Sequence, residues 1–143
     1  MIDDALNQLD GEGTVRVDLP QGEVELDVVE VGTLGVRVRS VRSTHRSAVG
    51  VGAHAERLSG RLRSLGETVK PVEVDVRLGR AILRTAPEEI RGGFFEVEVQ
   101  ERSVEVRRVG LREGERHRAD FVLTREQLGR LVGDLQPGVE EAG

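Results

Sequence analysis

The chain has 143 residues, of which 37% are hydrophobic and 33% charged, and its formal net charge is −5 at pH 7. This composition is typical of a folded domain and argues against a disordered chain. The acidic balance disfavours nucleic acid and anionic membranes as partners, because both bind basic surfaces. The chain contains no cysteine, which excludes disulfides and thiolate ligands, and no apolar run approaches the length of a membrane span.

Apolar and charged residues alternate along several stretches of the chain. In the first stretch, Val15, Val17 and Leu19 are separated by Arg16 and Asp18. Successive side chains of a strand point to opposite faces, so this pattern predicts antiparallel strands with one buried face and one solvated face.

The first third of the chain is predicted to form a short helix and three strands. An apolar stripe that begins at Ile2, with an acidic first turn, indicates the helix, and Gly11 would end it. Turn residues separate strands expected at about 14–19, 23–31 and 34–42. The apolar phase slips within the second strand, at Val28-Val29-Val31, which indicates a β-bulge.

A longer helix is expected over about 48–65, because an apolar stripe runs from Val51 to Leu65 at helical spacing. Ser47 is its expected N-cap, and Gly66 is expected just after its C-cap. Leu58 and Leu62 lie within the stripe, so we expect both side chains to be almost fully buried.

The rest of the chain is predicted to form a second group of strands and a final helix. The strands are expected at about 69–78, 80–86, 93–100, 103–110 and 117–123, with a turn from Pro87 to Gly93. Thr124 followed by Gln127 matches a capping box that begins a helix of about 125–135.

Together these elements predict an α+β fold in the order α-βββ-α-βββββ-α. We expect an antiparallel, strongly twisted sheet of about eight strands with helices packed on one face. Residues 1–136 are interpreted as a single domain and 137–143 as a flexible tail. Eight strands span about 38 Å, whereas two helices cover about 20 Å. The sheet must therefore curl, or a second subunit must cover the remaining apolar face, or that face lines a pocket.

The stretch before the long helix is a candidate anion-binding site. It contains Arg42, Ser43, Thr44, His45, Arg46 and Ser47. Free backbone N–H groups at a helix N-terminus, beside arginines and hydroxyls, suit a phosphate or a carboxylate. The alternative interpretation is a solvated loop in which Ser47 only caps the helix.

A candidate partner-binding surface contains Phe94, Arg102 and Arg107. If Phe95 faces the core, Phe94 lies on the outer face of its strand, where a partner could contact it. The alternative is that a loop or the first helix covers Phe94. Because exposed β edges need protection, we expect a homodimer through a sheet edge or the outer face near Phe94, with Arg102 or Arg107 at the rim.

The sequence contains no recognisable catalytic or metal-binding motif. His45, His54 and His117 are scattered, and none has a partner at metal-ligand spacing. No Ser-His-acid arrangement can be drawn from the sequence. We therefore expect no metal site, no cofactor and no catalytic residues.

These observations favour a non-enzymatic protein-interaction module, of adaptor or chaperone type, that forms a homodimer. The alternative is a small-ligand-binding domain with a pocket between the sheet and the helices, and an enzyme is the third hypothesis. The acidic N-terminus has no signal-peptide core, which predicts a cytoplasmic location. Lys70 is the only lysine among many arginines, a composition that we interpret as bacterial.

Overall fold

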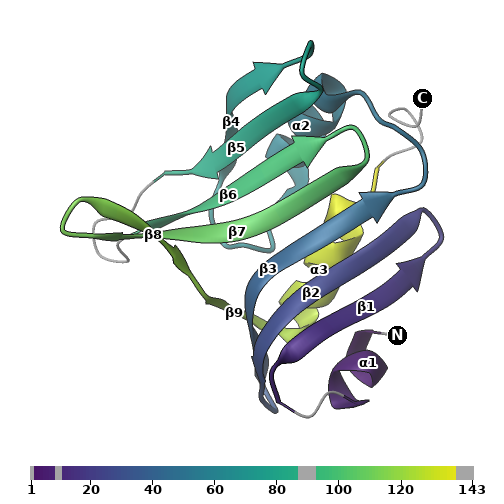
Figure 1. Ribbon diagram of the computed structural model, residues 1–143, viewed down its shortest axis with the longest axis vertical. Helices are drawn as coiled ribbons and strands as arrows, with labels where there is room; N and C mark the ends of the chain where they lie inside the picture. The colour runs from purple at the N-terminus through teal and green to yellow at the C-terminus, as the bar shows by residue number, and fades with distance from the viewer. Residues whose placement is uncertain (1, 9–10, 87–92, 138–143) are drawn as a thin grey trace.

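The computed structural model describes residues 2–8, 11–86 and 93–137 (Figure 1). Within them the order of elements is α-βββ-α-ββββββ-α, which confirms the predicted α+β class and adds one strand. The first half contains α1 (Ile2–Gln8), β1 (Gly13–Leu19), β2 (Gly22–Val31), β3 (Gly35–His45) and α2 (Val51–Arg61). The second half contains β4 (Val69–Asp75), β5 (Arg80–Thr85), β6 (Gly93–Gln100), β7 (Ser103–Arg112), β8 (Glu115–Ala119), β9 (Phe121–Thr124) and α3 (Arg125–Leu135).

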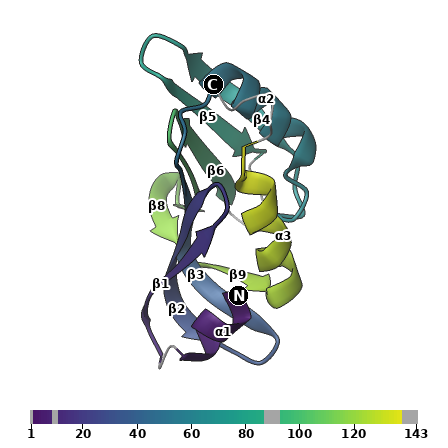
Figure 2. The same cartoon turned by 90° about the vertical axis from the view of Figure 1, so that its right-hand side faces the viewer.

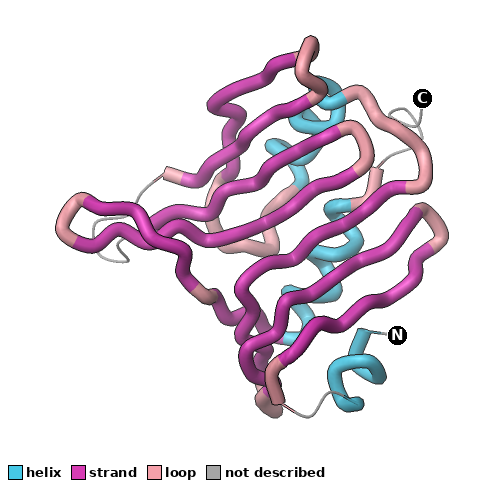
Figure 3. Tube along the Cα trace, in the orientation of Figure 1, coloured by secondary structure: helices cyan, strands magenta, loops and turns pink. Residues whose placement is uncertain are grey.

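The described strands form one antiparallel sheet that does not close. Its order is β1-β2-β3-β7-β6-β5-β4, with β8 paired to β7 and β9 paired to β3. In the middle of the sheet, β3 and β7 pair only over residues 40–44 and 103–107. Beyond this segment the two strands diverge, and β8 and β9 fill the fork between them (Figures 1 and 3).

Helices α2 and α3 cover one face of the sheet, and α1 lies beside β1 on the same side (Figure 2). The hydrophobic core lies between these layers. One row of side chains crosses five neighbouring strands and is completely buried: Leu26, Val41, Val106, Val97 and Leu83. The opposite face of the sheet, called the open face below, carries the charged side chains that alternate with this core.

The predicted β-bulge is present in β2, where the pairing with β3 shifts register on both sides of Val28. The strand expected at 69–78 ends earlier, at Asp75. The Asp75 carboxylate accepts a hydrogen bond from the Leu78 backbone N–H at 3.1 Å, and Gly79 has a φ of +63°. These contacts turn residues 76–79 into a hairpin loop instead of extending the strand.

Helix α2 is shorter than predicted and has a different N-cap. It begins after Gly50, and Ser47 is not its cap. The Val49 N–H donates to the Glu101 carbonyl oxygen at 2.8 Å, so the residues before α2 are fastened to the β6–β7 turn and cannot start the helix. The helix ends at Arg61, with Leu62 as its C-cap, so Gly66 does not follow the C-cap. Leu58 and Leu62 are nevertheless 0% and 2% exposed, which confirms their predicted burial.

Helix α3 has the predicted bounds and the predicted capping box. The Thr124 hydroxyl accepts from the Gln127 N–H at 3.0 Å, and the Gln127 side chain accepts from the Thr124 N–H at 2.9 Å. Its apolar stripe of Leu128, Leu131 and Leu135 is buried against the sheet. Both the start and the buried face of this helix follow from its own residues.

The strand predicted over 117–123 is two strands, β8 and β9, that meet at Asp120. β8 pairs with β7 and β9 pairs with β3. Because β3 and β7 diverge, the predicted single strand is divided into two. Two predictions lie outside the described residues: the turn at Pro87–Gly93, apart from Gly93, and the flexible tail, apart from Pro137.

Candidate functional site

The residues predicted to bind an anion lie mostly within β3 and not in a loop. Residues 42–45 pair with β2, so alternate side chains point to opposite faces of the sheet. Ser43 and His45 are buried on the helix-bearing face, whereas Arg42 and Thr44 are exposed on the open face. Arg46 and Ser47 are exposed beyond the strand. The structure does not bring these six residues together, and anion binding by them stays a prediction.

The buried members of this segment join β3 to both helices. The Ser43 hydroxyl accepts a hydrogen bond from the Gln136 side-chain amide at 2.9 Å, and Arg57 donates to the Gln136 carbonyl oxygen at 3.0 Å. The His45 ring meets the buried ring of His54 edge-on, with 5.6 Å between ring centroids. These polar side chains therefore position α2 and α3 on the sheet.

An ion cluster occupies the centre of the open face. We define it by Arg84, Glu96, Glu98, Glu105 and Arg107. Glu96 lies opposite Arg84 of β5 and Arg107 of β7, which are its cross-strand neighbours. Arg107 binds Glu96, Glu98 and Glu105 with contacts of 2.5, 3.0 and 3.2 Å, and Arg84 binds Glu96 at 2.8 Å. Arg107 was predicted to lie at the rim of an interface, and in the structure it binds three carboxylates of its own chain.

Two residues from the separate predicted sites, Arg42 and Arg107, line a common hollow on the open face. The hollow has a volume of about 110 Å³, and Glu98, Gln100, Ser103 and Glu105 complete its lining. Because two arginines and two glutamates line it, the hollow presents no uniform charge to a ligand.

The arginines of the ion cluster keep Glu96 and Glu98 ionised. Burial of the Glu96 carboxylate raises its pKa, but hydrogen bonds from Arg107 and Arg84 lower it by more, so the pKa lies below its ordinary value. The pKa of Glu98 is lowered in the same way, against the effect of burial, by hydrogen bonds from Gln100 and Arg107. At neutral pH both side chains are therefore carboxylates and poor proton donors.

Replacing Glu96 with glutamine is expected to lower the free energy of unfolding at pH 7 by about 2 kcal/mol. The Glu96 side chain is only 9% exposed, and its loss leaves part of Arg107 and Arg84 without an anion. Because the pKa of Glu96 is lower in the folded state, its contribution is present above the ordinary glutamate pKa and disappears as the pH falls through the folded value. The variant should therefore lose less stability than the wild type on acidification from about pH 5 to pH 3.

Urea denaturation at several pH values measures both parts of this expectation. Glu126→Gln is the matched control, because the Glu126–Arg130 pair is exposed and contributes under about 0.5 kcal/mol. Burial raises the pKa of Asp134. This residue therefore favours the folded state more as the pH falls, which is the opposite of the effect of Glu96. Asp134 is present in all three proteins, so the difference between them isolates Glu96. Parallel pH profiles for the wild type and Glu96→Gln would contradict the expectation.

The other two residues of the predicted partner-binding surface make contacts within the chain. Phe94 lies on the outer side of its strand, as predicted, but its side chain is 3% exposed. The guanidinium groups of Arg84 and Arg116 lie 5.4 and 5.5 Å from the centre of its ring. Arg102 donates to the Arg46 carbonyl oxygen at 2.8 Å and holds the β6–β7 turn against the end of β3. Partner binding by these residues stays a prediction.

The β4–β5 hairpin carries an exposed apolar surface that was not predicted from the sequence. We call it the hairpin strip and define it by Val72, Val74, Val76 and Leu78, which are 54%, 46%, 75% and 74% exposed. β4 ends the strand order, so one side of the strip has no neighbouring strand among the described residues. The alternation of these residues had indicated a buried strand face, because a sequence does not show that β4 ends the strand order and that the strand stops at Asp75.

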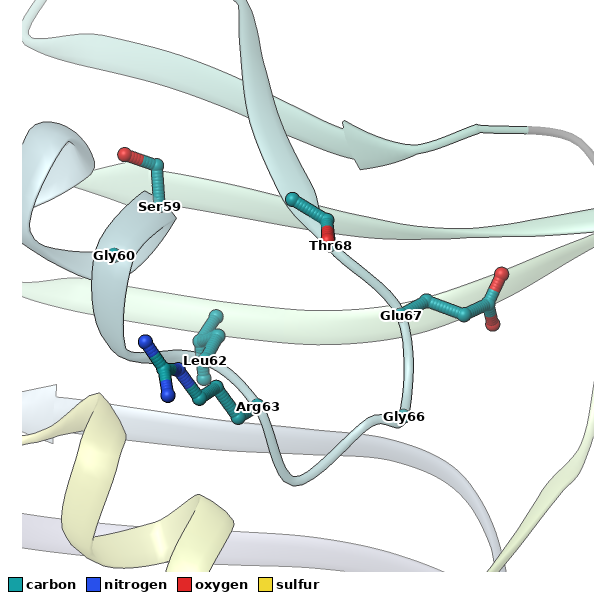
Figure 4. A pocket seen from close by; sticks show the side chains of 7 residues that line it. All are labelled: Ser59, Gly60, Leu62, Arg63, Gly66, Glu67 and Thr68. Atoms are coloured by element: carbon teal, nitrogen blue, oxygen red, sulfur yellow. The ribbon is translucent and has the colours of Figure 1, made fainter.

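A larger hollow lies where α2 ends and the chain leads into β4. It has a volume of about 480 Å³ and is lined by residues of 59–68 (Figure 4). The Glu67 side chain points away from those of Ser59 and Arg63 (Figure 4). Its carboxylate instead lies 3.6 Å from Arg108. The polar groups of this hollow therefore do not converge on a ligand position.

The described residues contain no group of three or more histidine, aspartate or glutamate side chains placed to hold a metal ion. Within the same residues, no helix has the length and apolar character needed to cross a membrane. Comparisons with protein-family models, with curated proteins and with solved structures found no match.

Proposed function

We propose that the chain is a non-catalytic protein-interaction module that forms a homodimer. The observation that carries the interaction module is the hairpin strip, which exposes four large apolar side chains at one end of the sheet. Exposed large apolar side chains that gather on one hairpin are a feature of binding surfaces. Glu96 and Glu98 on the open face support a non-catalytic role, because their arginine partners keep both as carboxylates that are poor proton donors at neutral pH.

The hairpin strip suits a protein with an apolar surface. Pro71 lacks a backbone N–H, and the β4–β5 register shifts between Pro71 and Glu73, so β4 is a poor template for an added strand. Side-chain contacts are therefore the mode of binding that fits this edge. Glu73 and Arg77 add charges of both signs close to the strip. A cytoplasmic location and a bacterial source stay predictions from composition.

The strip is tested by comparing what different variants capture from a lysate of the cells that produce the protein. Val76→Asp with Leu78→Asp is expected to lose partners that the wild type retains, because each change places a charge in the apolar contact. Val122→Asp is the matched control, since Val122 is 55% exposed on β9, away from the hairpin. An identical set of captured proteins for wild type, hairpin variant and control would contradict the proposed surface.

Self-association is tested separately by sedimentation equilibrium at micromolar concentration. A homodimer has twice the 15.7 kDa mass of the chain. A single species at 15.7 kDa would contradict the homodimer and leave the capture experiment as the test of the interaction module.

A further inference from the structure

The two ends of the sheet differ in how they are protected against pairing with another strand. At one end, β4 contains Lys70, Pro71 and a register shift, which are features that discourage added strands. At the other end, β1 pairs with β2 through seven consecutive positions without a shift, and it contains neither proline nor lysine. Among the described residues no strand pairs with the outer edge of β1. The edge of β1 therefore lacks the features that discourage an added strand at β4, and α1 lies beside it (Figure 1).

The outer edge of β1 presents backbone N–H and C=O groups to which a second strand could hydrogen-bond. Pro20 and Gln21 form a two-residue turn, which makes Leu19 and Gly22 a hydrogen-bonded pair. Hydrogen-bonded and non-hydrogen-bonded pairs alternate along an antiparallel ladder, so the backbone N–H and C=O groups of Arg16 and Asp18 point away from β2. These two residues would form the hydrogen bonds to a strand added at this edge.

The charges on the open face of β1 leave one acidic position without a cation. Arg16 lies opposite Glu25 of β2, and their side chains are 3.0 Å apart. Asp18 lies opposite Glu23, so two carboxylates face each other across the ladder, a pairing that disfavours the folded sheet. No ion pair of Asp18 is found within the described part of the chain. An arginine supplied from outside would complement this position.

A second copy of β1 supplies that arginine in one symmetric register. In an antiparallel pair related by a two-fold axis at Val17, Arg16 of each copy lies opposite Asp18 of the other, and Val15 lies opposite Leu19. An axis at Arg16 would place two arginines opposite each other, and an axis at Asp18 would place two aspartates opposite each other. The register at Val17 thus pairs opposite charges on the open face and apolar side chains on the helix-bearing face.

We propose that two copies of the chain pair antiparallel through β1, centred on Val17, and form one continuous sheet. This interface rests on the proposed homodimer and specifies where it lies. Figure 1 shows α1 just outside the edge of β1, and Figure 2 shows it toward the helix-bearing side, so the added strand would run over α1 as it continues the sheet. Leu19, which is half-buried in the single chain, then gains an apolar neighbour from the second copy.

A charge exchange tests the register. Arg16→Asp or Asp18→Arg alone creates two like-charge pairs across the interface, and each is expected to weaken the dimer by about tenfold or more. The double variant Arg16→Asp, Asp18→Arg restores both opposite-charge pairs and should recover the wild-type dissociation constant. The double variant also keeps the charge pairing with β2 within each chain, because one like-charge pair and one opposite-charge pair with Glu23 and Glu25 remain. Sedimentation equilibrium gives the constants, and Lys70→Glu on β4 is the control that should leave them unchanged.

Cross-linking gives a second and independent readout. The wild-type chain has no cysteine, so Val17→Cys introduces a single thiol. Val17 would form a non-hydrogen-bonded pair with its own copy, with Cα atoms about 4.5 Å apart, a separation that permits a disulfide. Oxidation should link the Val17→Cys dimer and leave the Val74→Cys control largely unlinked.

The possible results separate this interface from the homodimer itself. A dimer that tolerates both single charge changes, or that links through Val74→Cys instead of Val17→Cys, would overturn the β1 interface and leave the homodimer standing. A wild-type monomer at micromolar concentration would overturn both.

Discussion

Replacing Gly22 with alanine is expected to lower the free energy of unfolding by about 3 kcal/mol or more. Gly22 begins β2 and lies between Leu19 of β1 and His45 of β3. A Cβ atom at this position would lie 1.8 Å from the Thr44 carbonyl oxygen, which belongs to the backbone and cannot rotate away. The first residues of β2 would have to separate from β3, and the hydrogen bond from the Arg46 N–H to the Gln21 carbonyl oxygen, 3.0 Å long, would be disturbed as well.

Gly129→Ala is the matched control and should have the opposite sign. Gly129 lies in the middle of α3, and a Cβ atom there meets nothing within 4 Å. Alanine at an exposed position inside a helix is favoured over glycine by about 1 kcal/mol. Urea denaturation of both variants measures the two effects, and destabilisation by Gly129→Ala equal to that of Gly22→Ala would show that close packing at Gly22 is not the cause.

Replacing Leu62 with alanine is expected to cost about 2–5 kcal/mol. The Leu62 side chain is 2% exposed and belongs to the core between the sheet and the helices. Its truncation removes buried apolar surface and leaves a cavity that the neighbouring strands and helix α2 cannot fully close. Urea or thermal denaturation provides the measurement.

Leu34→Ala is the control for Leu62, because it removes the same atoms from a side chain that is 86% exposed. Its effect should lie within about 0.5 kcal/mol of zero. Equal effects at the two positions would contradict the layered packing of α2 on the sheet.

The hairpin strip and the edge of β1 give the molecule two distinct surfaces for association. The strip exposes apolar side chains on a strand that Pro71 and a register shift make unsuitable for pairing. The edge of β1 offers a regular backbone and a charge pattern that complements its own copy. A dimer formed through β1 would therefore leave both hairpin strips free, one at each end of the continuous sheet.

The candidate sites were harder to predict than the elements that carry them. Residues 42–47 contain the arginines and hydroxyls that suit an anion, but β3 extends through His45 and sends alternate side chains to opposite faces. Phe94 was placed on the correct face, yet its exposure depends on Arg84 of β5 and Arg116 of β8, which are distant in sequence. The exposed hairpin strip shows the same alternation as the buried strands, but it lies on the last strand of the sheet order and on the loop that follows it.

The sequence by itself determined the features that depend on neighbouring residues. Alternation with a period of two gave the strands, the apolar stripe gave the buried face of α2, and Thr124 with Gln127 gave the start of α3, because these patterns act within a few residues. The tertiary structure alone decided the fork that divides β8 from β9, the extension of β3 to His45 and the uncovered valines of β4. Each of these depends on which distant strand or helix occupies the neighbouring space, and therefore on packing across the whole sheet.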